Sequence, residues 1–113
     1  MNRLATIGYE RETQAQVIDR LKQAGIDYLH FPQLGTPKPG RDAARKGRTA
    51  EMRRIFEDHL AEPAAQLELA KAVEVVRERR AALLCYEADH KGCHRAIVAE
   101  RIREELGCEV VNL

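Results

Sequence analysis

The chain has 113 residues, a length that predicts one domain over residues 1–113 with one hydrophobic core. Its 19 Lys and Arg nearly balance its 18 Asp and Glu, so overall charge does not require a nucleic-acid partner. No apolar run approaches the ~20 residues of a membrane span, and no signal segment opens the chain. Three cysteines cannot form a full disulfide framework. We therefore expect a cytoplasmic protein with reduced thiols and no membrane partner.

Strand and helix patterns alternate along the first half of the chain. Residues 4–9 form a short apolar run that predicts a buried strand. Thr13 and Gln16 have the spacing of a capping box, which predicts that a helix begins there. Residues 27–31 are typical of a second strand, ended by a proline. Prolines and glycines interrupt residues 32–48, which we expect to be a loop.

The second half continues the alternation. A helix is expected from Thr49, and a second helix over residues 63–79, because apolar residues recur there at helical spacing. The apolar run at 81–86 predicts a strand, residues from about 93 to 106 a helix, and residues 109–113 a final strand. The whole pattern predicts a three-layer α/β fold, in which helices pack over a small, mostly parallel sheet of about four strands.

Right-handed crossovers would bring the carboxyl ends of these strands to one edge of the sheet. The first strand would contribute Gly8 and Tyr9, and the second would contribute His30 and the loop that follows it. The third would contribute residues 85–95. Because sites in open α/β sheets lie at this edge, we expect the functional groups to gather there.

The strongest motif is Cys85-x-Glu87-x5-Cys93-His94-Arg95. We expect Cys93 in the first turn of a helix, where unpaired amides and the helix dipole favour a thiolate. His94 and Arg95 add positive charge next to it. The motif therefore indicates a reactive or ligating Cys93, although a thiol that only caps the helix onto the sheet also fits.

A metal site is an alternative interpretation of the same stretch. Cys85, Glu87, Cys93 and His94 are all potential ligands, but the spacing is not Cys-x2-Cys and there is no second pair elsewhere.

Cysteine phosphatases and sulfurtransferases also place a cysteine before an amide-lined loop. In this chain Glu87 and Asp89 would repel the anion from such a loop. The residues identify no cofactor.

Residues 38–54 contain seven cationic and two acidic side chains, a local net charge of +5 in a nearly neutral protein. Such a segment attracts phosphates or acidic surfaces. The alternative to an enzyme is accordingly a binding module whose basic loop contacts nucleic acid or another acidic partner. A mobile, solvated loop explains the same composition.

Three stretches together resemble the family called domain of unknown function 488. They are Thr6-Ile7-Gly8-Tyr9-Glu10, then His30-x-Pro32-x-Leu34-Gly35-x-Pro37, then the motif from Cys85 to Arg95 followed by Ala99-Glu100-Arg101. The resemblance spans nearly the whole chain and implies a small bacterial or archaeal α/β protein, but it implies no particular reaction. The recurrent residues of the family would map to Gly8, His30, Pro32, Gly35, Cys85, Glu87, Cys93, His94 and Arg95.

The chain departs from this family pattern at one place. Members usually carry a further strand with Asp-Val-Arg, then a helix, before the His-x-Pro strand, and here Gly25 leads directly into residues 26–30. The arginine of that strand cannot contribute to a site. The chain is therefore a minimal version, a protein whose sheet is completed by a second copy in a homodimer, or a relative that has lost activity.

Our leading hypothesis is an enzyme-like α/β domain that acts on a phosphate-bearing or nucleotide-like small molecule. Cys93 would be the nucleophile or a ligand, His94 or His30 would transfer protons, and Glu87 would act as a base or an orienting partner. The residues expected to bind the substrate are Arg95, Tyr9, Gly8, Gly35 and Cys85.

The first prediction concerns the thiol of Cys93. If the helix amino end and the neighbouring cations stabilise its thiolate, alkylation of Cys93 will reach half its maximal rate at a pH clearly below about 8.5, the ordinary value for cysteine. The rate is followed against pH, and Cys93→Ala supplies the background from the other cysteines. A midpoint at or above about 8.5 would remove the nucleophile hypothesis.

Overall fold

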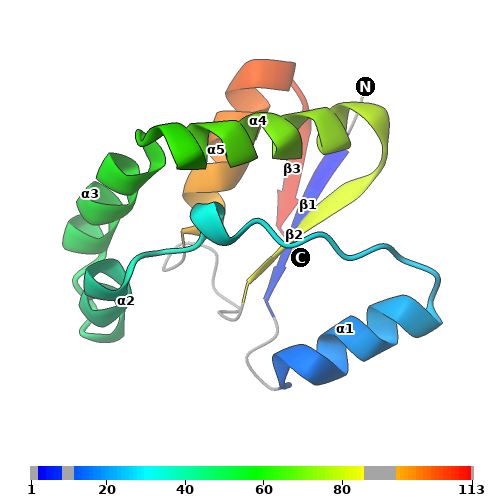
Figure 1. Ribbon diagram of the computed structural model, residues 1–113, viewed down its shortest axis with the longest axis horizontal. Helices are drawn as coiled ribbons and strands as arrows, with labels where there is room; N and C mark the ends of the chain where they lie inside the picture. Colours follow the sequence, from blue (N-terminus) through cyan, green and yellow to red (C-terminus); the bar gives the residue numbers. More distant parts are fainter. Residues whose placement is uncertain (1–2, 9–11, 86–93, 113) are drawn as a thin grey trace.

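The computed structural model describes residues 3–8, 12–85 and 94–112, and its described strands form one parallel sheet (Figure 1). The strands are β1 (Arg3–Gly8), β2 (Ala81–Cys85) and β3 (Glu109–Asn112), in the order β2-β1-β3. Both pairings of β1 are parallel. The expected α/β class and parallel sheet are confirmed, with three strands rather than about four.

One face of the sheet is covered by α5 (Arg95–Leu106), which contacts all three strands. Leu4 and Thr6 are both fully buried in β1, as expected for residues two apart that share one face of a strand. Ile102 of α5 is also fully buried. The helix that follows the Cys93 motif is therefore fixed to the sheet through its apolar side.

The first helix, α1 (Gln14–Gln23), begins with the expected capping box. The backbone N–H of Gln16 donates to the hydroxyl of Thr13 (3.2 Å), and the backbone N–H of Thr13 donates to the side-chain carbonyl of Gln16 (2.9 Å). Val17 is the only buried residue of α1. In Figure 1 the helix lies apart from the other described helices.

The predicted second strand at residues 27–31 is wrong, because this segment makes no ladder bonds with the sheet among the described residues. Both edges of β1 are already paired, so only the outer edge of an outer strand could accept it. The segment is held to a helix instead, since Arg79 at the end of α4 (Pro63–Glu78) pairs with Asp27 at 3.2 Å. The side chains of this segment nevertheless point alternately to two sides, as they do in a strand.

The predicted loop at residues 32–48 is also wrong, because it contains a 3₁₀ turn, η1 (Pro32–Leu34), and a helix, α2 (Lys38–Arg45). The residues that suggested a loop lie at helix ends or at a close contact. Pro39 lies in the first turn of α2, where a missing N–H costs nothing. A Cβ on Gly40 would approach the Thr36 methyl to 2.6 Å, so glycine lets these segments pack closely.

The helices α3 (Thr49–Leu60) and α4 were both expected, and they build the second part of the core. Met52, Phe56 and Leu60 recur at helical spacing in α3 and are almost completely buried. Val73 and Val76 do the same in α4, which also contacts α5. This packing brings α3 next to the beginning of α5.

The second prediction tests the turn that joins α2 to α3. Gly47 has φ +74°, a left-handed conformation that a side chain disfavours, and open space surrounds its Cα. Gly47→Ala should lower the free energy of unfolding by about 1 kcal/mol through backbone strain alone. Urea denaturation measures this, and Gly47→Asn is the control, because asparagine tolerates left-handed backbone and should cost less. Equal losses for the two variants would contradict strain as the cause.

Candidate functional site: a cavity beside β2

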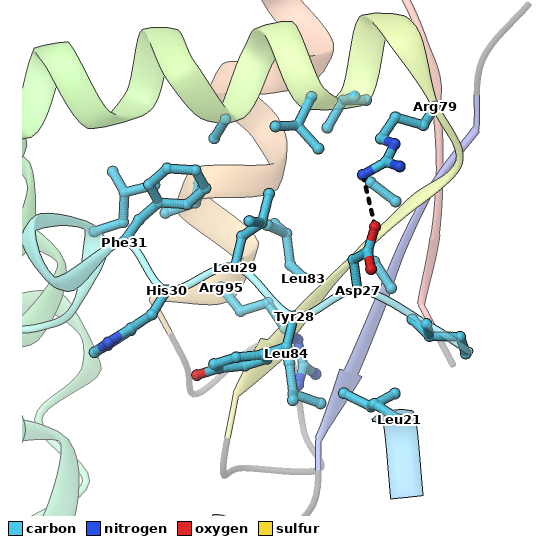
Figure 2. A pocket seen from close by; sticks show the side chains of 18 of the residues that line it. Leu21, Asp27, Tyr28, Leu29, His30, Phe31, Arg79, Leu83, Leu84 and Arg95 are labelled. Carbon is cyan, nitrogen blue, oxygen red and sulfur yellow. Dashed lines mark ion pairs between the residues drawn. The ribbon is translucent and has the colours of Figure 1, made fainter. Parts of the chain in front are cut away.

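A cavity of about 580 Å³ lies between the segment Gly25–Gly35 and strand β2 (Figure 2). Its other walls are the last turns of α4 and the beginning of α5. The volume lies within the usual range for small-molecule pockets. The segment 27–31, which was expected to form a strand, runs beside the cavity without joining the described sheet.

Arg95 contributes a buried cation to this cavity. It is the first residue of α5 and is only 2% exposed, yet it lines the cavity wall. The preceding residue, His94, caps the helix, and its carbonyl accepts hydrogen bonds from the amides of Ile97 (3.0 Å) and Val98 (3.1 Å). The helix start is thus well ordered by its own backbone bonds, which fixes where both side chains leave the chain.

The imidazole of His94 is kept neutral by its surroundings. Its ring packs against Phe56 with the centroids 5.2 Å apart and the planes inclined by 58°. Burial, and secondarily the positive charge of Arg95, lower the pKa of His94 to about 4. At neutral pH the ring therefore has one N–H donor and one acceptor nitrogen, and it adds no charge to the cavity.

Tyr28 and His30 form an aromatic side of the segment that borders the cavity. Their rings stack with centroids 6.4 Å apart and planes inclined by 24°. Figure 2 shows both extending from one side of the segment, whereas Leu29 and Phe31 extend from the other side, toward α4. His30 was expected in the site and Tyr28 was not, although their spacing of two in an extended segment would have indicated that they share a side.

The ionic side chains that line the cavity are mostly positive. They include Arg79, Arg80 and Arg95, against one carboxylate, Asp27, which pairs with Arg79. With the histidines left out of the count, the described lining has a formal excess of two positive charges. The remaining lining is largely apolar, with Leu83 and Leu84 of β2 among its members.

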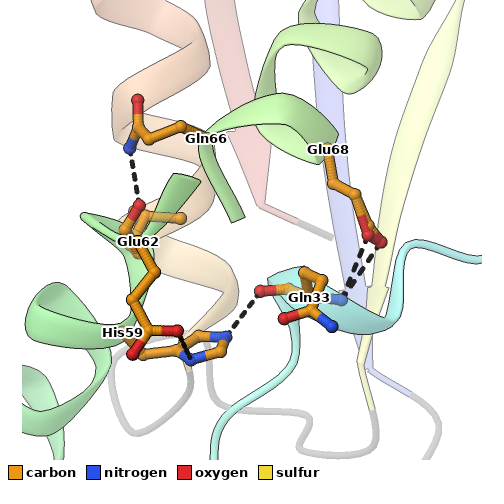
Figure 3. A network of polar contacts seen from close by, with 6 residues as sticks. Gln33, His59, Glu62, Gln66 and Glu68 are labelled. Atoms are coloured by element: carbon orange, nitrogen blue, oxygen red, sulfur yellow. Dashed lines mark hydrogen bonds and ion pairs between the residues drawn. The ribbon is translucent and has the colours of Figure 1, made fainter. Parts of the chain in front are cut away.

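The turn at Gln33 is held through both of its backbone polar groups (Figure 3). Its N–H donates to the carboxylate of Glu68 on α4, at 3.1 and 3.2 Å to the two oxygens. Its carbonyl lies 2.8 Å from Nε2 of His59 on α3. Since a carbonyl can only accept, Nε2 carries the proton, and Nδ1 faces Glu62 at 3.8 Å. The segment that borders the cavity is thereby attached to two helices.

The structure brings together four of the residues that the sequence predicted for the site. His30, Gly35, His94 and Arg95 all line the cavity, although they come from two distant stretches of the chain. Gly8 and Cys85 are register partners at the carboxyl ends of β1 and β2, as expected, and Gly8 is not among the residues that line the cavity. Tyr9, Glu87 and Cys93 lie outside the described residues.

Among the described residues, no three histidine, cysteine or acidic side chains are grouped closely enough to hold a metal ion. The metal hypothesis is not tested by this, because Glu87, Cys93 and the side chain of Cys85 lie outside that part of the chain. Cys108 is a buried free thiol. None of the described helices has both the length and the apolar composition required to cross a membrane.

The chain matches a protein-family model over most of its length. The model of the family described as domain of unknown function DUF488 matches residues 3–102, most of the chain. The chain belongs to the DUF488 family. The matched region of this DUF488 protein runs from β1 into α5 and so includes every described residue that lines the cavity. Searches of curated proteins and of solved structures each found no significant match.

The third prediction follows from the depressed pKa of His94. The unfolded chain takes up a proton near pH 6.5 and the folded chain only near pH 4, so the stability that His94 confers is complete above about 6.5 and is lost as the pH falls toward 4. A shift of this size corresponds to roughly 3 kcal/mol. Denaturant unfolding at several pH values should show that His94→Gln loses about 2 kcal/mol less than the wild type over this range. Parallel losses in both proteins would contradict the assignment.

Proposed function

We propose that this DUF488 chain binds a small phosphate-bearing molecule, of nucleotide-like character, in the cavity beside β2. The single observation that carries the proposal is the guanidinium of Arg95, buried in the wall of a cavity of about 580 Å³. A cation in a low-dielectric wall attracts an anion more strongly than a solvated one does. Guanidinium is also the side-chain group best matched to phosphate oxygens.

The charge of the cavity supports an anionic ligand. Arg79 and Arg80 lie on the same wall at the end of α4, and Asp27 is the only acidic residue of the described lining. The neutral ring of His94, next to Arg95, can offer the ligand a hydrogen bond but adds no positive charge. Such a set favours an anionic ligand.

The apolar part of the lining supports a ligand that also carries a ring. Leu83, Leu84 and Val76 provide apolar surface, and the stacked Tyr28 and His30 provide aromatic faces at the border. Pockets for organic ligands combine such apolar surface with a few convergent polar groups. A phosphate alone would leave most of this surface unused, so a nucleotide-like molecule fits better than inorganic phosphate.

An enzymatic role is the finer part of the proposal and rests on the sequence. His94 and His30 would transfer protons at the ligand, and Cys93, which directly precedes His94 in the chain, would be the nucleophile. Glu87 would be the base or orienting partner of the same site. Turnover that survived in Cys93→Ala would leave binding as the whole function.

The fourth prediction tests binding by isothermal titration with ADP and, separately, with inorganic phosphate. ADP should bind more tightly than phosphate, and Arg95→Gln should weaken ADP binding about tenfold or more, because it removes a charge-assisted contact. Arg80→Gln should weaken it a few-fold. Arg77→Gln is the matched control, because Arg77 lies in the last turn of α4, three residues before Arg80, but outside the cavity lining.

Circular dichroism establishes whether Arg95→Gln folds, because a buried cation is replaced by a neutral group. Arg80 is exposed, so Arg80→Gln tests the cavity even if the Arg95 variant unfolds. Equal affinities of the Arg80 and Arg77 variants would overturn this location for the site. Absence of binding by both ADP and phosphate to the wild type would overturn the ligand class.

A further inference from the structure

A second surface lies on the helices α2 and α3, which pack against each other at one end of the molecule, well away from α1 (Figure 1). Gly47 provides the turn between them. We call this surface the basic helix pair. Every cationic side chain between residues 38 and 54 is exposed on it. These side chains are Lys38, Arg41, Arg45, Lys46, Arg48, Arg53 and Arg54.

The exposure of these cations is fixed by the packing of the two helices. Ala43 of α2 and Met52 and Phe56 of α3 are buried in the core, so the polar residues between them are turned outward. The sequence suggested a loop here, in which the charges would be spread over many conformations. Two packed helices hold these exposed charges at fixed backbone positions, and a fixed array requires less ordering when it binds a partner.

The acidic residues nearby neutralise this surface only weakly. Arg45 and Asp42 are 3.8 Å apart, Arg48 and Glu51 are 3.7 Å apart, and all four side chains are exposed. Exposed pairs at such distances contribute little and exchange readily for other partners. Arg53 and Glu57 are likewise 3.8 Å apart. Over residues 38–60 the formal net charge is +3, with seven Lys and Arg against four Asp and Glu, so the surface attracts a polyanion even with all three pairs formed.

The residue types indicate which polyanion fits best. Five of the seven cations are arginines, whose planar guanidinium groups bind phosphate oxygens through two hydrogen bonds. No aromatic residue occurs between residues 38 and 54, and Phe56 is fully buried, so this segment offers no ring on which an unpaired base could stack. These features favour the phosphate backbone of a duplex over single strands.

We propose that the basic helix pair binds duplex nucleic acid through its phosphate backbone, without base specificity. The interactions are electrostatic, so affinity falls as salt rises, and the slope of log K against log salt reports the number of phosphates that the protein neutralises. This surface is separate from the cavity beside β2, because none of its seven cations lines that cavity. Binding at the two places can therefore be tested independently.

The fifth prediction is tested with fluorescence anisotropy on a labelled DNA duplex of about 20 base pairs, between about 50 and 200 mM salt. The wild type should bind two unrelated duplex sequences equally and single strands more weakly. The triple variant Arg41→Gln, Arg45→Gln, Arg48→Gln should weaken binding at least tenfold at the lowest salt. Its log–log slope should be shallower by about 0.9 for each phosphate that the variant no longer neutralises.

A matched triple variant separates this surface from net charge alone. Arg20→Gln, Lys22→Gln and Arg103→Gln remove the same number of exposed positive charges from α1 and α5, and should change affinity less than about twofold. Equal weakening by both triple variants would overturn the proposal, as would no duplex binding at about 50 mM salt. Tighter binding to single strands or to polyglutamate would also overturn it, in favour of base stacking or an acidic protein.

Discussion

The hydrogen bonding of β1 on both of its edges is the constraint on which the rest of the structure depends. With β2 on one side and β3 on the other, the chain that leaves α1 finds no place beside the first strand. It lies on the β2 side of the sheet, where α4 holds it through Arg79 and Glu68. The sheet therefore stops at three described strands, and the space between β2 and the segment becomes the cavity.

The chemistry of the cavity is a result of the core that surrounds it. Phe56 is fully buried and lies next to two histidine rings, His59 and His94. One of these rings binds the carbonyl of Gln33, and the other has its pKa lowered by burial at the start of α5. A single apolar side chain thus links the attachment of the outer wall to the electrostatics of the site.

The sequence predicted most helices correctly because their signals are local. The Thr13 capping box and the helical spacing of apolar residues in α3 and α4 act within one or two turns. The strand at residues 27–31 was mispredicted because residue types report on local preference, whereas a strand also needs a free sheet edge, which only the whole topology decides. Sequence reasoning pointed to His30 and His94 but missed Arg79 and Arg80, since nothing near them in the chain marks a site.

The two attachments of the outer wall to α4 also set its length. Asp27 is held at residue 79 and Gln33 at residue 68, and these two helix positions are separated by about 16 Å along the helix axis. Six residues can span about 20 Å when fully stretched. The stretched segment is therefore only slightly longer than the distance between the two helix positions that hold it. Because the segment is held at both ends, the two attachments limit its approach to β2 and help to keep the cavity open.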